Sequence, residues 1–112
     1  YFHTDACRAA GVCDLDVERL HVDAMTINGS KIYCPKGIGM LYIKRGVEME
    51  SMMLGGNQES SRRAGTENVP NIIGFTEALV IARNSREQES ARLIELRDYF
   101  ISRFLKEIPK PF

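Results

Sequence analysis

The sequence has no tryptophan, only three cysteines and no excess of either charge, since fifteen basic residues balance fifteen acidic ones. A balanced charge creates no overall field that would attract nucleic acid or an anionic membrane, so neither is expected as a partner. No apolar run approaches the length that crosses a bilayer. The whole sequence is 44% hydrophobic and 27% charged, which is an ordinary composition for a globular protein. Its 112 residues make at most one small domain.

The three cysteines, Cys7, Cys13 and Cys34, are an odd number and include no CxxC pair. A disulfide framework is therefore not expected, and the reducing cytoplasm is the favoured location. His3 and His21 could join the cysteines around a metal ion, but their spacing matches no zinc pattern. No metal site is predicted, and the cysteines are interpreted as small, partly buried residues.

Three apolar runs predict β-strands, at residues 1–6, 22–27 and 38–43. The middle run does not alternate strictly with polar residues, which is typical of a strand covered on both faces. The short connection to the third run permits an antiparallel neighbour. The first run starts at residue 1 without an initiator methionine, and this indicates a piece of a longer protein.

The second half of the chain predicts a polar loop followed by helices. The Gly-rich loop at 55–68 is long enough to be functional or disordered. Pro70 suits the first turn of a helix, and Ser85 with Gln88 forms a capping box that would start a second helical segment. In that segment apolar residues recur at i, i+3, i+7 and i+11, namely at Leu93, Leu96, Phe100 and Phe104. This period predicts an amphipathic helix, which Pro109 would end.

Lys31 and Asp5 each follow or close a predicted strand. Ligands of open α/β sheets bind outside the carboxyl ends of the strands, so both side chains are candidates for one site. A lysine in this position is either solvated beside a turn or desolvated, with the lowered pKa that suits Schiff-base chemistry. Asp5 is either a turn or capping residue or a ligand of a bound group. The residues by themselves leave these alternatives open.

Three motifs, in one order and spacing, resemble the cysteine desulfurases, which are class V, fold-type I enzymes dependent on pyridoxal phosphate (PLP). The motifs are Asp5-Ala6, Asn28-Gly29-Ser30-Lys31-Ile32-Tyr33-Cys34-Pro35-Lys36-Gly37, and Gly55-Gly56-Asn57-Gln58-Glu59 followed by Arg63-Ala64-Gly65-Thr66-Glu67-Asn68-Val69. The resemblance implies an α/β fold, with residues 1–82 as the C-terminal half of the PLP-binding large domain. Residues 83–112 would then form a connecting helix and the start of the small domain.

The resemblance also implies roles for individual residues. Lys31 would be the Schiff-base lysine, and Asp5 the carboxylate that keeps the pyridine nitrogen of PLP protonated. Ser30 stands where the family usually has a phosphate-binding histidine, and Asn28 where it has a serine; both keep a hydrogen-bond donor. Arg8 replaces a glutamine that faces the ring hydroxyl of the cofactor, and its fixed positive charge would favour the ionised phenolate.

Thr66 corresponds to a family threonine that reaches the cofactor phosphate of the neighbouring subunit. The resemblance therefore implies a homodimer whose partner orders the Gly-rich loop. On the local sequence, Thr66 and Asn68 are equally well interpreted as residues that cap the following helix.

The activity implied by the resemblance is conversion of L-cysteine to L-alanine, with the sulfur left on the enzyme as a persulfide. An acceptor or scaffold protein would then take the sulfur for iron-sulfur cluster or thio-cofactor assembly. The nucleophilic cysteine of the family lies beyond the last helix, and Cys7, Cys13 and Cys34 do not occupy its place. A class V aminotransferase, a selenocysteine lyase and an inactive truncated paralogue are the alternatives, and this chain alone is expected to be inactive.

Overall fold

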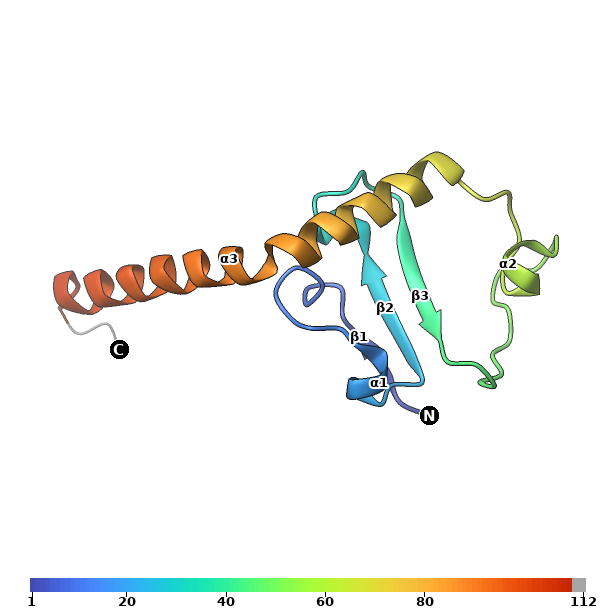
Figure 1. Ribbon diagram of the computed structural model, residues 1–112, viewed down its shortest axis with the longest axis horizontal. Helices are drawn as coiled ribbons and strands as arrows, with labels where there is room; N and C mark the ends of the chain where they lie inside the picture. Colours follow the sequence, from blue (N-terminus) through green and yellow to red (C-terminus); the bar gives the residue numbers. More distant parts are fainter. Residues whose placement is uncertain (110–112) are drawn as a thin grey trace.

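The structure, a computed structural model that describes residues 1–109, consists of a small sheet crossed by one long helix (Figure 1). The strands lie in the order β1-β2-β3, with β1 parallel and β3 antiparallel to β2. Their bounds are β1 His3–Asp5, β2 Ala24–Asn28 and β3 Gly39–Ile43. The three strands predicted from the apolar runs are confirmed, each somewhat shorter than its run, and so is the antiparallel neighbour.

Because β1 pairs in parallel with β2, the polar residues that end these two strands lie at the same edge of the sheet. Asp5, the last residue of β1, lies opposite Thr26, and β2 ends two residues later at Asn28. Since parallel strands point their carboxyl ends to the same edge, Asp5 and Asn28 share that edge. The 3-10 turn η1 (Gly29–Lys31) follows directly.

The two faces of β2 differ in exposure. Met25 and Ile27 are buried at 1% and 4% exposure, whereas Thr26 is half-buried and Asn28 is exposed. Successive side chains of a strand point to opposite faces, so this alternation describes a strand covered on one face. The prediction that β2 is covered on both faces is therefore wrong for the described part of the chain.

The core lies between the covered face of the sheet and the first half of α3 (Val69–Glu107). Phe75 is the one buried residue of α3, and Ala78, Leu79 and Ala82 pack against the same cluster. Asn68 begins the helix, because its side-chain oxygen accepts a hydrogen bond from the Asn71 amide, and Pro70 occupies the first turn as predicted.

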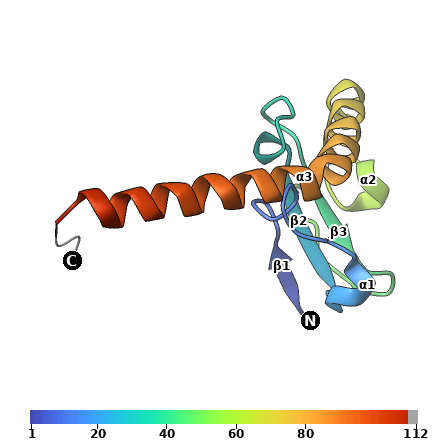
Figure 2. The same cartoon turned by 60° about the vertical axis from the view of Figure 1, so that its left-hand side comes forward.

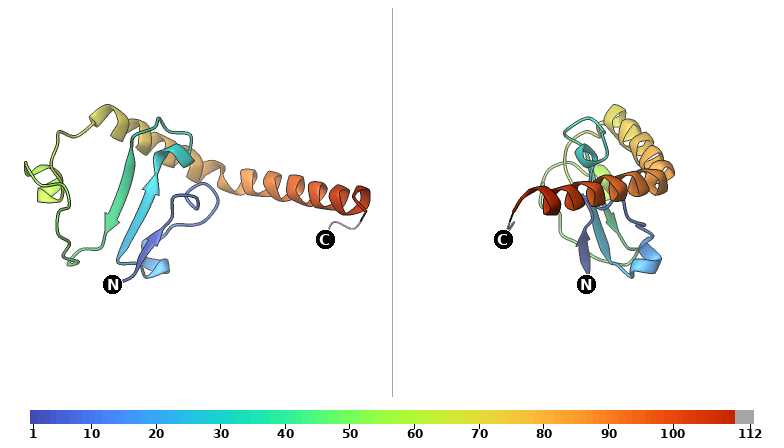
Figure 3. Two further views of the ribbon diagram at one scale, coloured as in Figure 1. Left: turned by 180° about the vertical axis from the view of Figure 1, so that it is seen from behind. Right: turned by 90° about the vertical axis from the view of Figure 1, so that its left-hand side faces the viewer.

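α3 is a single helix of 39 residues and does not restart at Ser85. The predicted capping box is wrong, because the Ser85 hydroxyl donates a 2.8 Å hydrogen bond to the Ile81 carbonyl inside the helix. Such back-bonding tends to bend a helix, and α3 changes direction near its middle in Figure 2. The second half extends away from the sheet, so the C-terminal end lies far from the N-terminus (Figure 3).

The last segment, which the sequence predicts to be an amphipathic helix, is helical in the structure, but its large apolar side chains are exposed. Phe100 is 65% exposed, although its ring stacks on Phe104 at a centroid separation of 6.0 Å. Leu93 and Leu96 are exposed as well. No helix within residues 1–109 is both long and apolar enough to cross a membrane.

Two short segments complete the fold. α1 (Val17–Leu20) is capped by Asp16, whose carboxylate accepts the amides of Glu18 and Arg19. α2 (Gln58–Ser61) lies inside the predicted polar loop and contains left-handed backbone. Glu59, Ser60 and Ser61 have φ angles of 51°, 58° and 65°, which side chains other than glycine seldom adopt.

Candidate active site

The turn after β2 holds Lys31 in a fixed place at the carboxyl edge. The Asn28 side-chain oxygen caps η1 by accepting the Ser30 amide at 2.9 Å, and the Gly29 amide donates to the Ile38 carbonyl at 3.0 Å. Gly29 is buried, and a Cβ added there would meet a ring carbon of Phe75 at 3.0 Å. Any larger residue would require its neighbours to shift, so α3 packs directly against the turn that ends in the exposed Lys31.

The Ser30 hydroxyl also donates to the Asn28 side-chain oxygen, at 2.8 Å. One hydroxyl has one proton to donate, so Ser30 is engaged within the turn and must leave Asn28 before it can donate elsewhere. The side-chain amide nitrogen of Asn28 keeps both of its protons for other acceptors.

Asp5 is surrounded by donors at the end of β1. The Cys7 amide donates to the Asp5 carboxylate at 2.9 Å. The Cys7 thiol, whose one proton is shared with the Thr26 carbonyl at 3.8 Å, and this amide together hold the pKa of Asp5 below its ordinary value of 3.8. Donors to the ionised form stabilise it, so Asp5 is a carboxylate at neutral pH.

Cys7 experiences the opposite effect. Its hydrogen bond with Asp5, together with burial, raises the pKa of the thiol, while the charge of nearby Lys31 lowers it by a smaller amount. The thiol is therefore protonated at neutral pH and is no thiolate nucleophile.

Replacing Cys7 by alanine is expected to raise the pKa of Asp5 towards 3.8, because the thiol donor is lost while the amide donor of residue 7 remains. A lowered carboxyl pKa stabilises the folded chain above the unfolded-state pKa, and this contribution disappears as the pH falls through the folded-state pKa. In Cys7→Ala this contribution should be smaller, and its loss should be complete at a higher pH, because the folded-state pKa of Asp5 is raised. NMR titration of the Asp5 carboxyl measures the shift, with Cys13→Ala as the control; an unchanged Asp5 titration in Cys7→Ala would refute the thiol contact.

A groove of about 1080 Å³ opens beside this edge. It reaches from Cys7, Asn28 and Ser30 along β3 to the first half of α3, and apolar residues such as Met40 and Phe75 line its floor. The cations of Lys36, Arg62 and Arg63 lie on the same lining. A groove with apolar walls and a few polar groups at one end is typical of a small-molecule site.

The predicted site residues do not all come together. Asp5, Asn28, Ser30 and Lys31 share the carboxyl edge, and Arg8 is exposed on the loop that follows Asp5. Thr66 is separate from them: it is exposed and lines a smaller hollow with Gly37, Gly39, Arg63 and Asn68.

The Cys7 contact is the functional feature that the sequence interpretation missed. A donor amide two residues after an aspartate is the geometry of an Asx turn, so the spacing of Asp5 and Cys7 carried the signal. Among residues 1–109 no group of three or more His, Cys, Asp or Glu side chains is placed to hold a metal ion.

A carboxylate at the end of one parallel strand and a lysine just after the next define an α/β protein with a ligand site at the carboxyl edge of its sheet. The comparisons with known proteins agree with this description. A model of the aminotransferase class-V family matches residues 1–110, and the chain belongs to that family.

Several curated relatives are similar to the chain over nearly its whole length. The cysteine desulfurase IscS of Dictyoglomus turgidum is 46% identical over 108 residues, which are 96% of this chain and 27% of that protein. The cysteine desulfurase IscS of Methanosarcina thermophila is 46% identical over 110 residues, 98% of this chain and 27% of that protein. The chain thus spans about a quarter of the length of these relatives.

Solved structures show the same fold. A NifS-like protein matches with a TM-score of 0.88 and 34% identity, over 93% of this chain and 28% of that one. The NifS-like protein from Rickettsia africae ESF-5 also gives 0.88, at 30% identity over 96% of this chain and 30% of its own. A structure described as SspA in complex with cysteine matches with a TM-score of 0.66 and 39% identity, over 70% of this chain and 23% of that one.

Proposed function

We propose that this chain is part of a PLP-dependent cysteine desulfurase, which takes sulfur from L-cysteine and leaves L-alanine and an enzyme-bound persulfide. The observation that carries the proposal is the ionised Asp5 on the same sheet edge as Lys31. The relatives that bear the name cysteine desulfurase support it, and so does the structural neighbour described with cysteine.

The donor set at the edge fits PLP. Asp5 would accept a hydrogen bond from the pyridine nitrogen, and because it stays ionised it would hold that nitrogen protonated. Lys31 would bind the cofactor covalently through its ε-amine. PLP supplies an electron sink that stabilises negative charge on a bound amino acid.

The flanking residues would fix the other parts of the cofactor. The free amide protons of Asn28 and, after rotation away from Asn28, the Ser30 hydroxyl would donate to the phosphate. Arg8 would provide a positive charge beside the ring oxygen. Thr66 lines a hollow that adjoins the groove and shares Gly37, Gly39 and Arg63 with it, and its exposed hydroxyl would be available to the phosphate of a second subunit. We therefore propose a homodimer, a sulfur acceptor or scaffold protein as partner in iron-sulfur assembly, and a place in cytoplasmic sulfur metabolism.

Reductive trapping tests the cofactor assignment. The chain is mixed with PLP and reduced with borohydride, and the labelled peptide is identified by mass spectrometry. Label is expected on Lys31, because that lysine follows β2 at the sheet edge where β1 ends in Asp5. Equal label on Lys36, Lys44 and Lys106 would overturn the assignment, since these lysines react as any exposed amine does.

An inactive paralogue is the second candidate. It is favoured by the engagement of the Ser30 hydroxyl with Asn28, and by Arg8, which the family resemblance would place at the ring in the position of a glutamine. Because this chain alone is expected to be inactive, L-cysteine is supplied to the PLP-loaded longer protein that contains the nucleophilic cysteine expected beyond the last helix, and this separates the two candidates. Formation of alanine together with a protein persulfide supports the desulfurase. Specific label on Lys31 without any alanine indicates a protein that holds the cofactor and has lost the reaction.

A further inference from the structure

α3 contacts both segments that carry the candidate site residues. Near its start, Phe75 packs under Gly29, two residues before Lys31. Eleven residues later, Arg86 donates a 3.2 Å hydrogen bond to the Cys13 carbonyl and approaches the Asp14 carboxylate at 3.5 Å. Eleven residues are three helical turns, so Phe75 and Arg86 lie on one side of α3 about 16 Å apart.

The segment that Arg86 holds is the loop leading away from Asp5. The Ala6 amide donates to the Thr26 carbonyl at 2.9 Å, and the loop then forms a helical turn through Ala9 and Ala10 to Cys13. Ala6 and Ala10 are buried in the core, so this loop is compact. Arg8 belongs to the same loop, and its side chain is exposed. Its start is fixed by the sheet and its end by Arg86.

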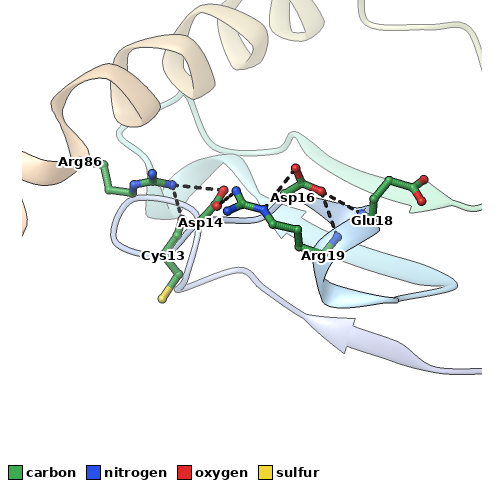
Figure 4. Close-up of polar contacts among 6 residues, drawn as sticks. All are labelled: Cys13, Asp14, Asp16, Glu18, Arg19 and Arg86. Carbon is green, nitrogen blue, oxygen red and sulfur yellow. Dashed lines mark hydrogen bonds and ion pairs between the residues drawn. The ribbon is translucent and has the colours of Figure 1, made fainter.

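Arg86 is part of a local network of charges (Figure 4). Asp14 also pairs with Arg19, and Arg19 in turn lies 3.4 Å from Asp16, the residue that caps α1. Exposed ion pairs contribute little to the free energy of folding. The side chain of Arg86, however, is only 26% exposed, whereas that of Arg19 is 69% exposed. The hydrogen bond from Arg86 to the Cys13 carbonyl also joins residues 73 positions apart. Contacts between sequence neighbours cannot take its place.

We propose that the Arg86 clasp, namely Arg86 with the Cys13 carbonyl and the Asp14 carboxylate, is a positioning device for the candidate site. It holds the Asp5–Arg8 loop in register with the Lys31 turn, because one continuous helix contacts both. Arg86 is thus a positioning residue and touches neither substrate nor cofactor. The effect expected at Lys31 rests on the proposed function, whereas the contact of Arg86 with Cys13 and Asp14 does not.

The first measurement is hydrogen exchange in the absence of PLP. Arg86→Met removes both contacts and keeps much of the apolar stem, so the amides of residues 6–13 should exchange about five- to tenfold faster. The matched control is Arg97→Met, an exposed arginine of the same helix whose partner is its neighbour Asp98. Amides of β2 should exchange as in the unaltered chain. Equal rates for residues 6–13 in both variants would overturn the clasp.

The second measurement is the PLP concentration at which Lys31 is half-labelled. Loosening the loop lowers the fraction of chains with a competent site, so Arg86→Met should require at least about threefold more PLP. Arg86→Lys keeps one charged donor and should restore part of the difference. Faster exchange with an unchanged half-labelling concentration would refute the positioning role.

Asp14→Asn is the gentler variant if Arg86→Met does not fold, because it removes the carboxylate charge and leaves the Cys13 bond. It should reproduce a smaller increase in exchange over residues 6–13, and no increase would overturn the clasp. A wild-type chain without label on Lys31 overturns the proposed function and the positioning role, while the exchange rates still decide whether Arg86 holds the loop.

Discussion

Replacing Lys31 by alanine is expected to abolish specific PLP labelling of the chain. Covalent capture needs a primary amine at the place where the cofactor aldehyde is presented, and Lys31 is the lysine in the turn that follows β2 at the sheet edge where β1 ends in Asp5. An alanine there keeps the capped turn, because the cap involves Asn28 and Ser30 and not the lysine side chain. The expected result is the loss of the labelled Lys31 peptide with no new dominant label elsewhere.

Two further variants make this result specific. Lys31→Arg keeps the positive charge but offers no amine of suitable reactivity, so it should also remove the label. Lys36→Ala removes a lysine that lines the groove five positions after Lys31 and should leave the label on Lys31 in place. Persistence of the total label in Lys31→Ala, spread over other lysines, would show that the edge presents no cofactor. The readout is the labelled fraction of each peptide by mass spectrometry.

Replacing Phe75 by alanine should cost about 3–5 kcal/mol of the free energy of unfolding, the range found for buried phenylalanine. Phe75 is 5% exposed and is the one buried residue of α3, so its loss leaves a cavity between helix and sheet. A chain of this size has a total stability of only about 5–15 kcal/mol. The variant should therefore unfold at much lower urea concentration, or fail to fold at room temperature.

Phe100→Ala provides the matched control, because Phe100 lies on the same helix and is 65% exposed. Its effect should stay within about 0.5 kcal/mol, as for other surface positions. Urea unfolding followed by circular dichroism gives both values. Similar midpoints for the two variants would mean that the first half of α3 does not pack on the sheet as described.

Phe75→Ala should also disturb the turn that carries Lys31. The ring packs against Gly29, so its removal frees the η1 backbone that the contact confines. Faster exchange of the Gly29 amide, which donates to the Ile38 carbonyl, would report this loosening. Unchanged exchange there would separate the stability of the core from the placement of Lys31.

The elements that local chemistry determines could be predicted from the sequence. The apolar runs gave three strands, and Asn68 with Pro70 gave the start of α3, because capping and fixed backbone angles act over a few residues. The motif around Lys31 predicted a polar turn at a strand end, and the structure has one there. Family membership followed from the same motifs.

The tertiary structure decided the rest, because it depends on partners far apart in the chain. The parallel pairing of β1 with β2 brings Asp5 to the edge occupied by Lys31, and no local signal fixes that pairing. The tertiary structure also kept α3 continuous through Ser85, where the local pattern favoured a new start. The bond from Arg86 to Cys13 spans 73 positions and has no local signature in the sequence. The residue types of the site were therefore readable from the sequence, whereas their mutual placement required the fold.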